Sequence, residues 1–322
     1  MLGGTTVERL RAAVVGAGNM GRHHVRILGG IEGVDLVGVV DADFALASAR
    51  AAAVGATPFT EAAQLPDVDL AVVAVPTPAH ATVASVLMRR GAGVLVEKPL
   101  AATPAEAAEL VQVAGETGVV LAVGHTERFN PAVRALISLV EDPLLMQFER
   151  LSPYTPRISE SIVFDLMVHD LDLACLMAGE YPVRVETVGT RVFSDTLDIA
   201  SAVLSFPSGC VASLQASRAT QDKVRRIAIS ERERFLLADS IRQDVSIKRE
   251  TTGTYENDAL YRQASVVEIP YLDRHAEPLA LELANFVAAV RGEEPPAVGG
   301  AAGRMVVELA HTVEDMANGS VG

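Results

Sequence analysis

Asp165 and His169 are the two residues whose types and spacing most clearly suggest catalysis. They stand four positions apart in a stretch expected to form a helix, which places both side chains on one face. A carboxylate beside an imidazole orients or charges the ring, as a general base requires. The alternative is an acid near the helix N-terminus and a structural histidine on a solvated stripe. A metal site that adds Asp170 is poorly supported, because adjacent helical residues point to different faces, and no metal is expected.

Lys98 is the second candidate for chemistry. It follows a strand expected over 93–97 and precedes Pro99. A lysine at the end of a buried strand is costly unless it faces a polar cleft, where its ammonium would donate to a substrate hydroxyl. A surface lysine at a strand end is an alternative of equal weight.

A glycine-rich loop near the N-terminus predicts a dinucleotide site. Gly16, Gly18 and Gly21 form G-x-G-x-x-G between the apolar run 12–15 and a helix expected over 20–28. Gly16 permits a tight turn, Gly18 lets a pyrophosphate approach the backbone, and Gly21 lets the helix pack closely. The amides at the helix N-terminus then face the phosphates. The alternative is an ordinary glycine-rich turn.

Asp41 supports the dinucleotide interpretation. It ends the second expected strand, 35–40, about 20 residues after the last glycine. A carboxylate there accepts hydrogen bonds from ribose hydroxyls and repels a 2′-phosphate, so NAD is expected rather than NADP. Asp43 could share this role.

Helices and strands alternate as far as Gly124, which predicts a doubly wound parallel sheet in a first domain, residues 1–124. After Gly124, eight short strand-like runs predict a second α/β domain, residues 125–322, with a large, mainly antiparallel open sheet. Helices are expected in this second part over 159–177, 277–290 and 303–316, the last packing back near the first domain.

Ligands of open α/β sheets bind at the carboxyl ends of the strands. Three segments should therefore converge there, namely 75–80, 97–99 and 124–131. The helix that carries Asp165 and His169 should supply the fourth. We therefore expect Lys98 and His169 to face each other across a cleft.

Composition restricts the partners. Acidic residues outnumber basic ones 41 to 27, which leaves a formal charge of −14 without any basic block. Nucleic acid and anionic membrane are thus poor partners, and an anionic substrate must be held by a few local cations. The cations expected in the second domain are Arg150, Arg157, Arg218, Lys223 and Arg225. The two cysteines are isolated, and neither a signal core nor a membrane-length apolar run is found, so a cytoplasmic location is expected.

Three motifs together resemble the family of glucose–fructose oxidoreductase, inositol dehydrogenase and related sugar dehydrogenases (Gfo/Idh/MocA). They are the loop 16–21, the run Glu97-Lys98-Pro99 and the pair Asp165-x-x-x-His169. The resemblance implies an NAD(P)-binding Rossmann domain and a second domain whose open sheet often forms the surface of a homo-oligomer, here a dimer or tetramer. It also implies that Lys98 bridges cofactor and substrate, that His169 takes the hydroxyl proton with assistance from Asp165, and that the bond before Pro99 is cis.

Further contacts are expected on the same basis. Those to the cofactor are Asn19, Met20, Pro76, Thr77, His80, Glu97 and Arg128. Those to the substrate are His125, Asn130, Arg150, Arg157 and Arg218.

A finer resemblance is to the UDP-N-acetylglucosamine 3-dehydrogenase branch, carried by 124–131, 165–172 and Ser217-Arg218 followed by Lys223-Val-Arg225. The expected function is therefore NAD-dependent oxidation of a ring hydroxyl of a nucleotide sugar to a ketone. One alternative is a dehydrogenase of inositol, another polyol or a free sugar. An alternative of another class is a non-catalytic NAD-binding sensor, which would have no use for Lys98, Asp165 and His169 together.

Overall fold

The computed structural model describes residues 9–156, 160–251, 264–273 and 277–320. The chain divides into two compact units, each described here by itself. The first comprises Met1–Thr126 and Glu277–Glu308, and the second comprises Glu127–Ala276 and Leu309–Gly322. The sequence predicts a domain boundary at residue 124. The division in the structure differs from this prediction mainly because residues 277–308 join the first unit.

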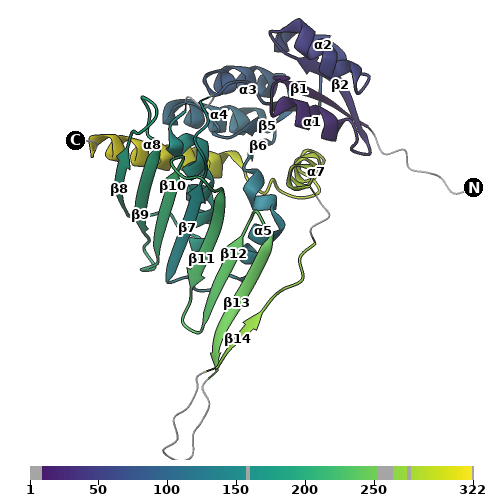
Figure 1. Ribbon diagram of the computed structural model, residues 1–322. Coiled ribbons are helices and arrows are strands. Elements are labelled where there is room, and N and C mark those ends of the chain that lie inside the picture. Colours follow the sequence, from purple (N-terminus) through teal and green to yellow (C-terminus); the bar gives the residue numbers. More distant parts are fainter. Residues whose placement is uncertain (1–8, 157–159, 252–263, 274–276, 321–322) are drawn as a thin grey trace, which may run out of the picture. The chain divides into compact units, whose positions relative to one another are not determined.

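The first unit is built on a six-stranded sheet in the order β3-β2-β1-β4-β5-β6. Figure 1 labels β1, β2, β5 and β6 of this sheet. All its strand pairs are parallel, as expected for a doubly wound sheet. The strands are β1 (Leu10–Val15), β2 (Val34–Val40), β3 (Thr57–Phe59), β4 (Leu70–Val73), β5 (Gly93–Glu97) and β6 (Leu121–Gly124). The short edge strand β3 was not among the predicted elements.

Helices cover the sheet of the first unit. They are α1 (Gly21–Leu28), α2 (Phe44–Ala52), α3 (His80–Arg89), α4 (Pro104–Thr117) and α7 (Pro278–Val290), with 3-10 turns at η1 (Ala62–Gln64) and η2 (Thr77–Ala79). Helix α7 belongs here because Leu279, Leu283 and Phe286 are buried in one core with Val14 of β1 and Leu28 of α1. These three positions lie on one helical face, and their burial anchors the returning chain.

The second unit contains an eight-stranded sheet in the order β14-β13-β12-β11-β7-β10-β9-β8 (Figure 1). Only the pair β7 and β10 is parallel, so the sheet is mainly antiparallel, as predicted. The strands are β7 (Leu145–Leu151), β8 (Arg184–Thr190), β9 (Ile199–Ser205), β10 (Val211–Ser217), β11 (Val224–Ser230), β12 (Arg234–Asp239), β13 (Asp244–Thr251) and β14 (Ala264–Glu268).

The segment predicted as one helix over 159–177 is instead a π-helical turn, η4 (Val163–Met167), followed by α6 (Val168–Ala178). The 3-10 turn η3 (Thr126–Phe129) and helix α5 (Pro131–Leu139) lead from β6 into the second sheet. Helix α8 (Gly300–Gly319) contributes residues up to Glu308 to the first unit and the rest to the second. Among the helices of the described residues, none is long and apolar enough to cross a membrane.

Candidate active site

The glycine loop has the shape that a dinucleotide cradle requires. Gly16 has φ 99°, and a Cβ there would lie 2.4 Å from the carbonyl oxygen of Ala74. A Cβ on Gly21 would lie 1.8 Å from the carbonyl oxygen of Gly16, so the start of α1 can approach the loop only without a side chain. A Cβ on Gly18 would meet no described atom within 4 Å, which leaves space beside the backbone for a bound group.

The side chain of Asp41 connects the end of β2 to this loop through hydrogen bonds. One carboxylate oxygen accepts a hydrogen bond from the backbone N–H of Ala17 at 2.8 Å, and the other accepts from Asp43 at 2.9 Å. The side chain of Asp43 caps α2 by accepting from the N–H groups of Ala45 and Leu46. The carboxylate of Asp41 is therefore fixed beside the cradle, whereas that of Asp43 is engaged in capping. The residues fit a dinucleotide with Asp41 near its ribose.

Asn19 and Met20, both exposed, lie immediately before α1. Pro76 and Thr77 follow β4, and the loop continues through η2 to the buried ring of His80. The Nδ1 atom of His80 lies 2.8 Å from the carbonyl oxygen of Pro99, and its Nε2 lies 2.9 Å from that of Val75. The ring thus joins the loop after β4 to the loop after β5.

Glu97 is buried at the end of β5, and Lys98 follows it half-buried. The peptide bond between Lys98 and Pro99 is cis, as the family resemblance implies. The Nε2 of the fully buried His24 lies 2.6 Å from Oε1 of Glu97. Burial alone would raise the pKa of Glu97, but the hydrogen bond from His24 and the charge of Lys98 hold it below its ordinary value.

A second carboxyl group, that of Glu282 on α7, is buried near Glu97. Burial raises its pKa well above the ordinary value, and the negative charge of Glu97 raises it further. The Thr126 hydroxyl donates to Oε2 of Glu282 at 3.0 Å and opposes this shift only in part. Of the two neighbouring acids, Glu282 thus holds its proton to higher pH than Glu97.

The substitution Glu282→Gln tests this assignment through the pH dependence of stability. The unfolded chain releases the proton near the ordinary pKa of 4.5, whereas the folded chain holds it to higher pH. Wild type therefore loses stability as the pH rises from 4.5 through the raised pKa. We expect the unfolding free energy of the variant, relative to wild type, to increase over that window in urea titrations. A difference that does not change with pH would contradict the assignment, and the exposed Glu293→Gln is the control.

In the second unit, Asp165 lies in the π-turn η4 and His169 in the first turn of α6, both half-buried. The backbone N–H of Asp165 donates to the carbonyl of Ser161 at 2.9 Å. Phe164, the neighbour of Asp165, packs edge-on against the ring of His311. A single π-turn interrupting a helix is common at functional sites, and here it carries the candidate acid.

Arg150, predicted to contact substrate, is buried on β7 and paired with two acids of the same unit. Its Nη2 donates to Asp170 at 2.7 Å, its Nε donates to the same carboxylate, and its Nη1 donates to Glu127 at 3.0 Å. Burial opposes the charge, but the two carboxylates outweigh it and raise the pKa of Arg150. Its guanidinium is thus already engaged by protein groups.

The neighbouring cations are similarly engaged. Burial, and then the positive charge of Arg150, lower the pKa of Arg225 to about 10. Arg225 donates to the carbonyl of Leu151 at 2.6 Å. Arg128, predicted to contact the cofactor, makes a bidentate ion pair with Asp172. Its Nε donates to Oδ2 at 2.7 Å and its Nη2 donates to Oδ1 at 2.5 Å.

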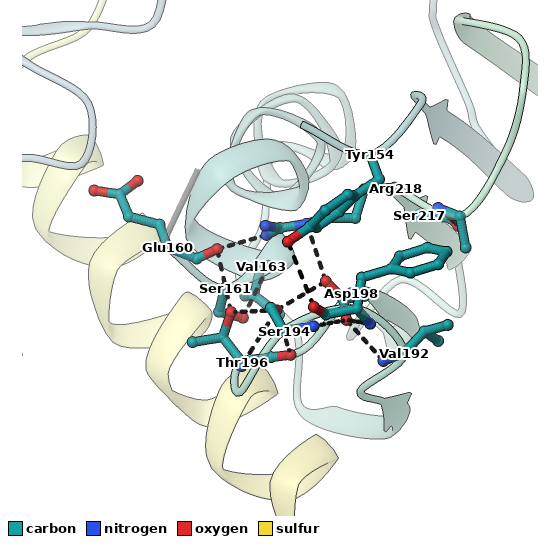
Figure 2. Close-up of polar contacts among 12 residues, drawn as sticks. Tyr154, Glu160, Ser161, Val163, Val192, Ser194, Thr196, Asp198, Ser217 and Arg218 are labelled. Carbon is teal, nitrogen blue, oxygen red and sulfur yellow. Dashed lines mark hydrogen bonds and ion pairs between the residues drawn. The ribbon is translucent and has the colours of Figure 1, made fainter. Parts of the chain in front are cut away.

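Arg218 lies in a network centred on Asp198 (Figure 2). Its Nη2 donates to the carbonyl of Glu160 at 2.5 Å, and its Nε lies 3.6 Å from Asp198. Asp198 accepts from the N–H groups of residues 192–194 and from the hydroxyl of Ser194. Burial raises the pKa of Asp198, but these donors lower it below the ordinary value. The network therefore fixes the chain that leads into η4.

The remaining predicted contacts have other placements. His125 is buried directly after β6. Asn130 caps α5 by accepting from Ala132 and donates to the carbonyl of Ser240. Lys223 is exposed. Arg157 lies outside the described residues.

Two residues of the site were missed by the sequence analysis, and both carried a signal. His24 stands three positions after Gly21, on the face of α1 that also buries Val25 and Leu28. Glu282 interrupts the apolar stripe of α7, between Leu279 and Phe286 in sequence. A polar residue on a buried helical face needs a partner, so each position predicts an interaction inside the protein.

Two family models match the chain. The model described as "Oxidoreductase family, NAD-binding Rossmann fold" matches residues 10–125, and the GFO/IDH/MocA C-terminal domain matches residues 141–233.

Similarity to individual proteins extends over almost the whole chain. A UDP-N-acetylglucosamine 3-dehydrogenase of Acidithiobacillus ferrooxidans is 34% identical over 94% of this chain and 95% of its own. A solved structure of that species' enzyme has a TM-score of 0.89 at 32% identity, over 98% of this chain and 99% of the other. An inositol 2-dehydrogenase of Rhizobium meliloti is 28% identical over 94% of each chain.

Proposed function

The chain belongs to the Gfo/Idh/MocA family of NAD-binding oxidoreductases, and from this premise we propose that it oxidises a ring hydroxyl of a nucleotide sugar, with UDP-N-acetylglucosamine the preferred candidate. The similarity to a UDP-N-acetylglucosamine 3-dehydrogenase over nearly the full length of both chains carries the proposal. Retention of the glycine cradle, Lys98, Asp165 and His169 supports catalysis rather than NAD sensing.

The first unit supplies the cofactor side of the proposed site. The open space beside Gly18 would take the pyrophosphate, and the carboxylate of Asp41 would accept from the adenosine ribose. When bound, NAD supplies the hydride acceptor.

The chain's own residues handle the proton and the charge that forms on oxygen. His169 accepts the hydroxyl proton while Asp165 orients the ring. Lys98 donates to the same oxygen and stabilises its developing negative charge. The carbon–hydrogen bond breaks as the carbonyl forms, so one hydride and one proton leave the sugar. In this proposal Lys98 and His169 meet at one substrate oxygen.

The recognition of a diphosphate stays a prediction. Arg150 and Arg218 already pair with acids or carbonyls, so any contact to a phosphate would use only the guanidinium edges that remain. Among the predicted cations, the exposed Lys223 is the one most accessible for donation to a phosphate. The homo-oligomer implied by the family resemblance also stays a prediction.

An inositol or another polyol is the second candidate substrate, favoured by the similarity to an inositol 2-dehydrogenase. A panel that follows NADH absorbance with UDP-N-acetylglucosamine, free N-acetylglucosamine and myo-inositol separates the candidates. We expect kcat/KM for the UDP form to exceed that for the free sugar by about 10² or more, because charge-assisted contacts to a diphosphate are absent from the free sugar. Equal turnover of the two would refute the nucleotide requirement, and faster turnover of myo-inositol would favour the polyol.

Cofactor preference gives a separate prediction. We expect NAD to bind at least about tenfold more tightly than NADP, because the Asp41 carboxylate repels the 2′-phosphate. Fluorescence titration of both dinucleotides measures the ratio. Asp41→Asn should reduce this preference for NAD over NADP. Asp43→Asn alters only the cap of α2 and should leave the preference unchanged. Tighter binding of NADP by wild type would refute the prediction.

A further inference from the structure

Two buried histidines of the first unit hold the protein backbone on either side of Lys98. We propose that His24 and His80 are positioning residues that keep Lys98 at the place where it acts on the substrate. The inference rests on the proposed function, in which Lys98 contacts the reacting oxygen.

His24 acts on the N-terminal side of Lys98, through Glu97. The ring of His24 is 0% exposed and donates from Nε2 to Oε1 of Glu97 at 2.6 Å. The other oxygen of Glu97 accepts from the backbone N–H of Lys98 at 3.3 Å. One carboxylate therefore joins helix α1 to the peptide group of Lys98, and its orientation is fixed from both ends.

The neighbouring strand leaves the Glu97 side chain little room for another orientation. Glu97 pairs with Gly124 in the register of β5 and β6. A Cβ on Gly124 would lie 3.1 Å from Oε2 and 3.2 Å from Cα of Glu97. The carboxylate thus occupies the space that a larger residue at position 124 would fill, and packing reinforces the hydrogen bond from His24.

His80 acts on the C-terminal side of Lys98, through Pro99. Its ring is 1% exposed, and its nitrogens face the carbonyl oxygens of Pro99 and Val75 at 2.8 and 2.9 Å. Both partners are acceptors, so whichever ring nitrogen carries the hydrogen donates to one of them. The ring lies between these two carbonyl groups and so connects the loop after β4 to the residue that follows Lys98.

The charges around this arrangement are consistent with the role. Glu97 carries a negative charge beside His24 and Lys98, and burial together with Glu97 raises the pKa of the neighbouring Glu282. The segment Glu97–Pro99 is thus held by the buried carboxylate of Glu97 and by the buried ring of His80.

Kinetics of His24→Leu and His80→Gln in the full-length protein test the inference. The first variant removes the donor to Glu97, and the second replaces the ring between the carbonyl groups of Pro99 and Val75 with a shorter amide. A displacement of about 1 Å in a reacting group costs on the order of 10² in rate. We therefore expect kcat to fall roughly 10- to 100-fold in each variant, with the NAD dissociation constant and KM changed less than about threefold. His24→Gln, which keeps a donor, should recover part of kcat, and His23→Leu on the same helix is the control.

Combination with Lys98→Met separates positioning from a general effect on the fold. If the histidines act through Lys98, adding His24→Leu to Lys98→Met should cause almost no further loss of kcat. Wild-type kcat in both folded histidine variants, or full additivity in the double variant, would overturn the inference. Should His24→Leu fail to fold, His80→Gln in the Lys98→Met background gives the same comparison. Full activity of Lys98→Met itself would instead refute the proposed role of Lys98.

Discussion

Lys98→Met and His169→Asn are each expected to lower kcat by roughly 10²- to 10⁴-fold, the usual contribution of one positioned acid, base or donor. Methionine keeps the approximate length of lysine but cannot donate to the developing alkoxide. Asparagine keeps polarity at position 169 but cannot accept the proton. NAD should still bind to both variants, because the glycine cradle and Asp41 are unchanged. Steady-state assays together with NAD titrations measure both quantities.

The double variant adds a stricter comparison. If Lys98 and His169 act on one oxygen, their combined loss should be far smaller than the product of the two single losses. The exposed Lys248→Met, on β13, is the control for removing a lysine. Full activity in either single variant would contradict the proposed mechanism, as would multiplicative losses in the double variant.

Asp170→Asn is expected to destabilise the protein by about 3–5 kcal/mol, since it leaves Arg150 buried with a single remaining acid. Arg150 and Asp170 are 4% and 2% exposed, so water cannot replace the lost carboxylate. Urea unfolding measures the change. The neighbouring pair of Glu149 and Arg226 is a matched control, because its side chains are 40% and 51% exposed. Glu149→Gln should cost about 0–1 kcal/mol.

A second variant distinguishes an unpaired charge from lost packing. Replacing both partners, as Arg150→Met with Asp170→Leu, removes the buried charges together and should be less destabilising than Asp170→Asn alone. A cost for Asp170→Asn as small as that for Glu149→Gln would contradict the account of this ion pair.

Much of the fold could be predicted because its signals are local. Apolar runs bounded by glycine indicated the buried parallel strands, and a series of short strand-like runs indicated those of the second sheet. The π-turn at Val163–Met167 was missed, because it departs from the regular helical period only locally. Helix α5 was missed although Asn130 and Pro131 form a standard start signal, with Asn130 as the cap.

The positions of Asp41 and Lys98 could be predicted, because each directly follows the strand that the sequence indicates, β2 or β5; their roles in the site stay predictions. The surroundings of the arginines were less predictable, because net charge does not indicate which face of a strand a cation occupies. Arg150 shares its strand face with the buried Met146 and Phe148, so the period of two could have indicated an internal partner. The acids that engage Arg150 and Arg128 lie between 20 and 44 positions away in sequence, and only the tertiary fold brings them together.

The central claim is that a ring carbon of a nucleotide sugar gives its hydride to NAD in this protein. The most direct measurement uses UDP-N-acetylglucosamine carrying deuterium at C3, the position named for the similar 3-dehydrogenase. Mass spectrometry of both products then follows the label. Deuterium is expected to appear in the reduced dinucleotide and to be lost from a keto sugar that keeps its UDP group. A reduced dinucleotide without the label, or label retained in an unoxidised sugar, would contradict the claim.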